Sequence, residues 1–400
     1  MVVICDISAW QYWGTPPLLA AVPIAPEVAV LPEPAGAAWP RRLLRFQSNA
    51  RDAYRLVQDR LLFDLKGLEP PVCVMCDDSA NRCHSSLVAP RPIPGWLRPE
   101  HVVAIGGGLH VLLPQALLYS VKGHVGSSFS KTVLLAKMMF ELSGIFALPP
   151  NTSRMRLAMR LLEAEGSFFP DAFRGVGVYG YADARGVPFG DRDDRGDPRL
   201  WVPAFDRLGQ YAGMWKRPPL TSVGEIGRAL DALGVSSPRS CLVRALGMAL
   251  DGAASPAEVQ ACILLCANRR FGGEGWDAPW LNRQIIYTSE AVALARSPWC
   301  FADGLWPGTG GILEVQGVAF HADRQGFREA SGRTAALEAM GYSVAELLPE
   351  QMANLELFDA ILPTLARKLG FELKERTAAF LRRRAVLHKE LFGAPYGPVR

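Results

Sequence analysis

The segment FADGLWPGTGGILEVQ, residues 301–316, decides the fold of the C-terminal half of the chain. It contains two short runs of strand-forming residues, and the run PGTGG between them favours a tight reversal of the backbone. The segment therefore predicts a β-hairpin, with Asp303 on its first strand and Glu314 on its second. Such a hairpin brings the two carboxylates close together.

Paired carboxylates of this kind need an electrostatic partner when they are removed from water. They are usually kept apart, protonated or held by a divalent cation such as Mg²⁺. Glu314 and Gln316 are two residues apart, so a strand directs both side chains to one face of the sheet. The residues alone leave two interpretations open. Asp303 and Glu314 hold a metal ion, or Asp303 belongs to a turn and Glu314 is a surface carboxylate.

A helix is predicted to begin directly after Ser255, in the segment SPAEVQACILLC. Ser255 is a suitable N-cap, Pro256 suits the first helical position, and Glu258 stands where a capping-box carboxylate would. This capping role is sufficient to explain Glu258 without any chemistry.

Alternating strand-like and helical patterns predict a mixed α/β protein built from several parts. We expect an N-terminal α/β domain at residues 1–150 and a mainly helical bridge at 151–252, which includes a polar loop near 180–200. An α/β core follows at 253–372, and a basic C-terminal helix and tail complete the chain at 373–400.

Composition limits the class of protein. A chain of 400 residues with 49% hydrophobic content exceeds what one core usually organises. No apolar run is long enough to span a membrane, and eight scattered cysteines suit a reducing compartment, so we expect a cytoplasmic protein without a membrane partner. The formal charge of +4 is too mild to demand a polyanionic partner. Between residues 241 and 400 acidic and basic residues are equal in number, so any DNA contact must come from local patches.

The residues from Ser255 to about Gly370 resemble the very-short-patch-repair endonuclease-like domain of the PD-(D/E)xK nuclease superfamily. The resemblance is carried by ordered pieces: SPAE, GG, PWLN, LWP, LEVQG and GRTAALEAMGYSV. The last piece places Arg333, Leu337 and Gly341 at the family's R-x-x-x-L-x-x-x-G spacing. The resemblance covers about a quarter of the chain and implies a restriction-endonuclease-like core.

This resemblance implies a metal-dependent DNA endonuclease. It makes Asp303 and Glu314 the ligands of Mg²⁺ or Mn²⁺, with Glu258 as a helper on the first helix. His321 would assist the attacking water or the leaving oxygen, and Arg333 would contact phosphate or brace the site. The implied reaction is hydrolysis of a phosphodiester bond.

Two departures from the family pattern affect this implication. Gln316 stands where the superfamily has lysine, and glutamine can orient a water molecule but cannot take its proton. The segment REASGR also lacks the aspartate that the family places shortly before the arginine. The alternative interpretation is therefore a catalytically inactive nuclease fold that acts as a DNA-binding or antitoxin-like regulatory protein.

The N-terminal region resembles the segment that precedes this nuclease domain in actinobacterial proteins related to the AbiE-type antitoxin family. The similar pieces are DISAW, CHSSLV, GGGLHVLLPQALLYSV and MMFELSGIFALPP. This resemblance implies a phage-defence or toxin–antitoxin context, in which the N-terminal domain binds a toxin or another protein.

The C-terminal segment FELKERTAAFLRRRAVLHKELF predicts a basic amphipathic helix. Its arginines Arg382, Arg383 and Arg384 are candidate contacts to DNA phosphates. The alternative is a solvated helix that packs its apolar side on the domain.

Overall fold

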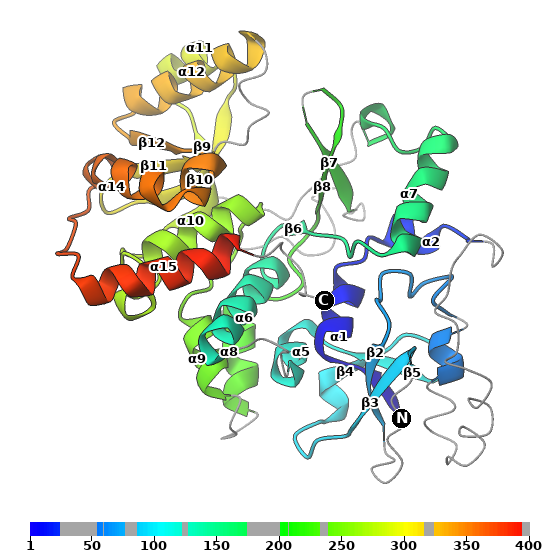
Figure 1. The fold of residues 1–400 in the computed structure, drawn as a ribbon. Coiled ribbons are helices and arrows are strands. Elements are labelled where there is room, and N and C mark those ends of the chain that lie inside the picture. The colour runs from blue at the N-terminus through cyan, green and yellow to red at the C-terminus, as the bar shows by residue number, and fades with distance from the viewer. Residues whose placement is uncertain are drawn as a thin grey trace.

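The computed structural model shows three sheets joined by helices (Figure 1). It describes residues 1–24, 54–58, 60–76, 86–121, 127–173, 201–206, 208–232, 239–315 and 324–393. The mixed α/β class predicted from the sequence is confirmed.

The N-terminal sheet has five strands in the order β3-β2-β1-β5-β4. Its central strand is the short apolar run that opens the chain, and that strand pairs antiparallel with β2 and parallel with β5. The glycines between β4 and β5 form a hairpin turn at positive φ. The elements are β1 (Val2–Ile4), α1 (Asp6–Trp13), α2 (Pro17–Ala21), β2 (Val72–Cys76), β3 (Val88–Pro92), η1 (Pro99–His101), β4 (Val102–Ala104) and β5 (Leu109–Leu112).

The middle of the chain combines helices with a small sheet of order β6-β8-β7. We expected a mainly helical bridge, and the β7–β8 hairpin is a difference from that expectation. The aromatic, half-buried runs WVPAF and YAGMW on either side of a polar turn form it. The predicted polar loop near 180–200 lies outside the described residues. The elements are α5 (Pro114–Ser120), α6 (Ser128–Leu142), β6 (Phe146–Ala147), α7 (Ser153–Ala164), η2 (Pro170–Phe173), β7 (Val202–Phe205), β8 (Tyr211–Lys216), α8 (Val223–Ala232) and α9 (Arg239–Leu246).

The C-terminal sheet has the order β12-β11-β10-β9, with α10 and α14 on one side and α11 and α12 on the other (Figure 1). The β10–β11 hairpin is the one that the opening segment predicts, and Gly310 in its turn has a positive φ. The elements are α10 (Pro256–Cys266), η3 (Arg269–Phe271), β9 (Trp280–Ile286), α11 (Ser289–Ala295), β10 (Trp299–Trp306), β11 (Gly311–Val315), α12 (Arg324–Ala339), β12 (Ser343–Leu347), α13 (Pro349–Ala353), α14 (Leu355–Leu369) and α15 (Ala378–Phe392).

One large apolar core runs from the N-terminal sheet through α5, α6, α8 and α9 to α10, α14 and α15. A second core lies between the C-terminal sheet and the helices α11 and α12. The C-terminal sheet is therefore packed on both faces, and polar side chains in its interior need partners. Among the described helices, none is both long enough and apolar enough to cross a lipid bilayer.

Candidate functional site

The β10–β11 hairpin places Asp303 and Glu314 on adjacent strands. In its register Gly304 lies opposite Leu313. Asp303 precedes Gly304 on β10 and Glu314 follows Leu313 on β11, so the two acidic residues are adjacent to this pair. The backbone N–H of Val315 donates to Oδ2 of Asp303 over 2.7 Å. The hairpin predicted from the sequence is present, and the charge of Asp303 acts on the pKa of Glu314.

Glu314 is buried between β11 and α12, with 7% of its surface exposed. Its Oε2 accepts a hydrogen bond from the guanidinium of Arg333, which also donates to the backbone oxygen of Phe301. Its other carboxylate oxygen, Oε1, has no hydrogen-bond partner within the described part of the chain. An unpaired buried carboxylate oxygen is costly, so this atom is the position where an additional cation is most favourable.

Glu258 approaches the hairpin from the first turn of α10 and is also buried. Its Oε1 accepts from the Ser255 hydroxyl over 2.9 Å. Its Oε2 accepts from the Ala254 N–H over 2.8 Å and from Nδ2 of Asn282 over 2.7 Å. The predicted Ser255 cap is present, but the carboxylate of Glu258 accepts from the Ala254 N–H and the Ser255 hydroxyl, and not from the Ser255 N–H as in a capping box.

Asn282 is the residue that sequence reasoning missed at this site. It lies on β9 with a φ of 47°, in the left-handed region that asparagine tolerates better than most residues. Its amide also donates to the backbone oxygen of Gly252 over 2.9 Å. The left-handed backbone and the short amide together tie the edge strand to the start of α10 and hold Glu258 in place.

The three carboxylates of Glu258, Asp303 and Glu314, which we call the acidic cluster, influence one another electrostatically. Burial and the nearby charge of Asp303 raise the pKa of Glu258 to about 8 and that of Glu314 to about 8. Burial also raises the pKa of Asp303, against the lowering effect of Arg333 and, at longer range, Lys216. Ionising all three carboxylates together is therefore unfavourable, so the cluster keeps protons unless a cation balances its charge.

A small cavity separates α10 from the hairpin. Its volume is about 10 Å³, which is roughly the space that one water molecule requires. Glu258, Asp303, Cys262, Trp306 and Val315 are among the residues around it, and the surface that lines the cavity is apolar. The cavity therefore lies beside Glu258 and Asp303, on the α10 side of the hairpin.

The donor set fits a divalent cation of the Mg²⁺ type bound by two carboxylates. Within the described ranges, no three His, Cys, Asp or Glu side chains are placed to form a complete cage for a metal ion. Mg²⁺ does not require one, because it usually keeps several waters and is held by one or two carboxylates together with substrate phosphates. Asp303 and the unpaired Oε1 of Glu314 could supply two such ligands, whereas the oxygens of Glu258 are already engaged.

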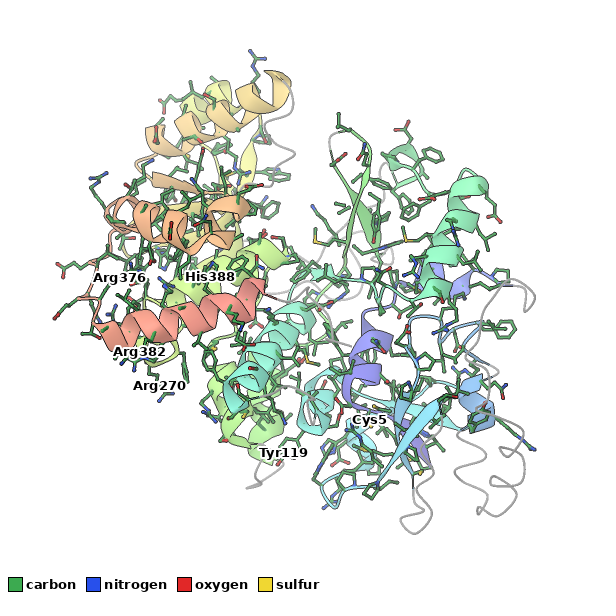
Figure 2. All side chains as sticks on the ribbon, in the orientation of Figure 1. Cys5, Tyr119, Arg270, Arg376, Arg382 and His388 are labelled. Carbon is green, nitrogen blue, oxygen red and sulfur yellow. The ribbon has the colours of Figure 1, made fainter. Side chains whose placement is uncertain are left out.

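The other residues predicted for the site are placed as follows. Gln316 and His321 lie outside the described residues, so their predicted roles stay predictions. Arg382 and Arg383 are exposed on α15. Figure 2 shows Arg382 on the side of α15 where Arg270 of η3 also lies. Arg384 differs from the expectation, because it is fully buried and forms no part of the basic surface.

Arg384 belongs to a second buried ionic group, which we call the Glu274 cluster. Glu274 forms ion pairs with Arg269 at 3.5 Å, with Arg376 at 2.9 Å and with Arg384. Arg376 also pairs with Asp359 at 2.8 Å. These contacts fasten α15 to α14 and to the segment after α10, so Arg384 stabilises the fold.

Comparison with protein-family models, with curated proteins and with solved structures gives no significant match.

Proposed function

We propose that the chain is a divalent-metal-dependent nuclease that hydrolyses phosphodiester bonds in DNA. The observation that carries the proposal is the pairing of Asp303 with Glu314 on a buried hairpin, where one oxygen of Glu314 lacks a partner. The arrangement of the C-terminal sheet supports a restriction-endonuclease-like core at residues 253–372, since helices cover both faces and the acidic hairpin lies at its centre.

In this proposal Asp303 and Glu314 hold Mg²⁺ or Mn²⁺. A bound divalent cation polarises the phosphoryl group and lowers the pKa of water. The residues of the chain orient the ligands and position the helix beside them. The N–H of Val315 and the packing of the hairpin fix the orientation of Asp303. Glu258 lies beside the cavity, and the hydrogen bond that it accepts from Asn282 joins α10 to the edge strand of the sheet.

The proposal includes a phage-defence or toxin–antitoxin context, with a protein partner bound by the N-terminal α/β domain. Its support is the resemblance of that region to antitoxin-related proteins. The proposal also includes DNA contacts from Arg382 and Arg383, whose support is their exposure on the basic helix α15.

The test is cleavage of supercoiled plasmid DNA by the purified protein, with Mg²⁺, with Mn²⁺ and with a chelator. Asp303→Asn and Glu314→Gln should each reduce metal-dependent cleavage by roughly 100-fold or more, because each removes a ligand charge. Glu346→Gln is the matched control, since Glu346 pairs directly with Glu314 in the β11–β12 register but is exposed. It should leave cleavage unchanged.

The contrary outcome is an absence of metal-dependent cutting on plasmid, single-stranded DNA and RNA, together with no uptake of metal in calorimetry. That result would reject the nuclease and favour the alternative, a catalytically inactive nuclease fold. Gel-shift binding of labelled DNA by the same samples would then test whether the fold acts as a DNA-binding module.

A further inference from the structure

Arg333 occupies an unusual position, because it is the only cation in contact with the acidic cluster among the described residues. It reaches Glu314 from α12 and simultaneously donates to the backbone of β10 at Phe301. About a third of its side chain, 32%, remains exposed, although Glu314 beneath it is buried. Part of the Arg333 side chain therefore reaches solvent, while its Nε is buried and has no hydrogen-bond partner within the described residues.

The contact between Arg333 and Glu314 conflicts with a divalent cation at the same carboxylate. A metal ion that binds Glu314 through Oε1 lies within a few ångströms of the guanidinium on Oε2. At a separation of roughly 4–5 Å two positive charges repel strongly in a partly buried site. Metal binding and the Arg333–Glu314 contact therefore oppose each other.

The backbone that carries Arg333 is held in place, so the side chain must accommodate this opposition. Gly332, the preceding residue, packs so closely on α11 that an added Cβ would lie 2.7 Å from the backbone oxygen of Leu294. This close approach fixes α12 against α11. The long, partly exposed side chain of Arg333 can instead turn away from Glu314 toward solvent, where a DNA phosphate would approach.

We infer that Arg333 is an exchangeable counter-ion: divalent metal displaces its guanidinium from Glu314, and the released guanidinium then binds the DNA phosphate. The inference rests on the proposed nuclease function and adds a coupling between metal uptake and substrate binding. By linkage, the arginine weakens metal binding by the same factor by which metal weakens the arginine contact.

The test measures metal affinity without DNA, by titration calorimetry of the full-length protein with Mn²⁺. Arg333→Gln should bind Mn²⁺ about tenfold more tightly than the wild type, which lies within the usual range of coupling between sites. The same variant should cleave DNA at least about tenfold more slowly, because the phosphate contact is lost. A purely structural arginine would not produce tighter metal binding together with slower cleavage.

Two control variants distinguish the displacement of Arg333 by metal from a general effect of the protein's net charge on metal affinity. Lys216→Gln removes a positive charge that acts on Asp303 from a distance, and Arg367→Gln removes an exposed one from α14. Lys216→Gln should raise Mn²⁺ affinity by less than about twofold and Arg367→Gln should not change it, since long-range effects between solvated charges are screened. Equal increases in Arg333→Gln and Lys216→Gln would overturn the exchange.

The outcomes also distinguish this inference from the nuclease proposal. If the wild type binds metal and cleaves DNA but Arg333→Gln binds Mn²⁺ no more tightly, the exchange is wrong and the nuclease stands. If only Arg333→Gln takes up Mn²⁺, the exchange is supported and the wild-type site is closed by its own arginine. If neither takes up metal, both proposals fail. Should Arg333→Gln not fold, Arg333→Lys provides the second variant, with a smaller increase in affinity.

Discussion

The acidic cluster and the Glu274 cluster lie in the same half of the molecule and differ in the sign of their excess charge. In the Glu274 cluster three guanidiniums surround two carboxylates, and Arg376 joins them between α14 and α15 (Figure 2). In the acidic cluster three carboxylates have one guanidinium in contact. A cluster with surplus arginine needs no further cation and fastens helices together. A cluster with surplus carboxylate is completed by protons or by a metal ion.

The largest expected effect comes from removing the charge at the centre of the Glu274 cluster. Glu274→Gln keeps the shape of the side chain but leaves Arg269, Arg376 and the buried Arg384 without their shared anion. Breaking a buried ion pair from one side costs about 3–5 kcal/mol of unfolding free energy. Urea denaturation would measure the loss, and Glu346→Gln, an exposed glutamate, should change stability by less than about 0.5 kcal/mol. A loss below about 1 kcal/mol would mean that the cluster does not fasten α15.

The acidic cluster should make stability depend on pH in the opposite sense from most carboxylates. Glu258 and Glu314 have a pKa of about 8 in the folded protein and an ordinary value of 4.5. Between these values the folded chain binds more protons than the unfolded chain, so the unfolding free energy of the metal-free protein falls as pH rises. Arg333 and Lys216, which face the cluster, favour the ionised forms and limit the fall.

Urea denaturation at pH 5, 6.5 and 8 with a chelator should show this fall, by about 2 kcal/mol. Saturating Mn²⁺ should reduce the slope, since the ion replaces the protons. A metal-free stability that stays constant or rises over this range would show that the three carboxylates are not coupled by burial.

A smaller effect, in this case a stabilisation, is expected when the charge repulsion within the acidic cluster is reduced. Asp303→Asn keeps an oxygen that accepts the Val315 N–H and removes one repelling charge. At pH 8 without metal, the variant should be more stable than the wild type by about 1 kcal/mol, because functional sites commonly retain unfavourable charge. Thermal denaturation should also show that Mn²⁺ no longer raises its Tm. Asp277→Asn, an exposed neighbour, should behave as the wild type in both respects.

The parts of the site that sequence reasoning predicted are those set by local rules. The glycine turn, the hairpin and the Ser255 cap depend on residues a few positions apart, and all three are present. Asn282 could not be predicted, because its role depends on a left-handed backbone and on Glu258, which lies 24 residues away. The position of Arg333 over Glu314 likewise depends on how α12 packs on the sheet.

Arg384 is a different case, since the sequence contained the signal that separates it from its neighbours. It follows Phe380 by four residues and precedes Leu387 by three, so helical periodicity places it on the buried side of α15. A charge on the apolar side of a helix indicates a buried partner. Treating the three consecutive arginines as one basic patch ignores helical periodicity, which places Arg384 on a different side of α15 from Arg382 and Arg383.

The smallest expected effect on stability follows from this division within the arginine run. The double variant Arg382→Gln with Arg383→Gln should change unfolding free energy by less than about 0.5 kcal/mol, because both side chains are exposed. If they contact DNA phosphates, the dependence of log Kd on log salt should lose a slope of about 2, roughly one for each contact. Arg384→Gln should instead destabilise the protein. The salt dependence of DNA binding by the molecules that stay folded should not change, because the charge of Arg384 is buried against Glu274. Fluorescence anisotropy with labelled DNA at several salt concentrations separates the two cases. An unchanged salt slope in the double variant would place the DNA-binding surface elsewhere and leave α15 with a structural role alone.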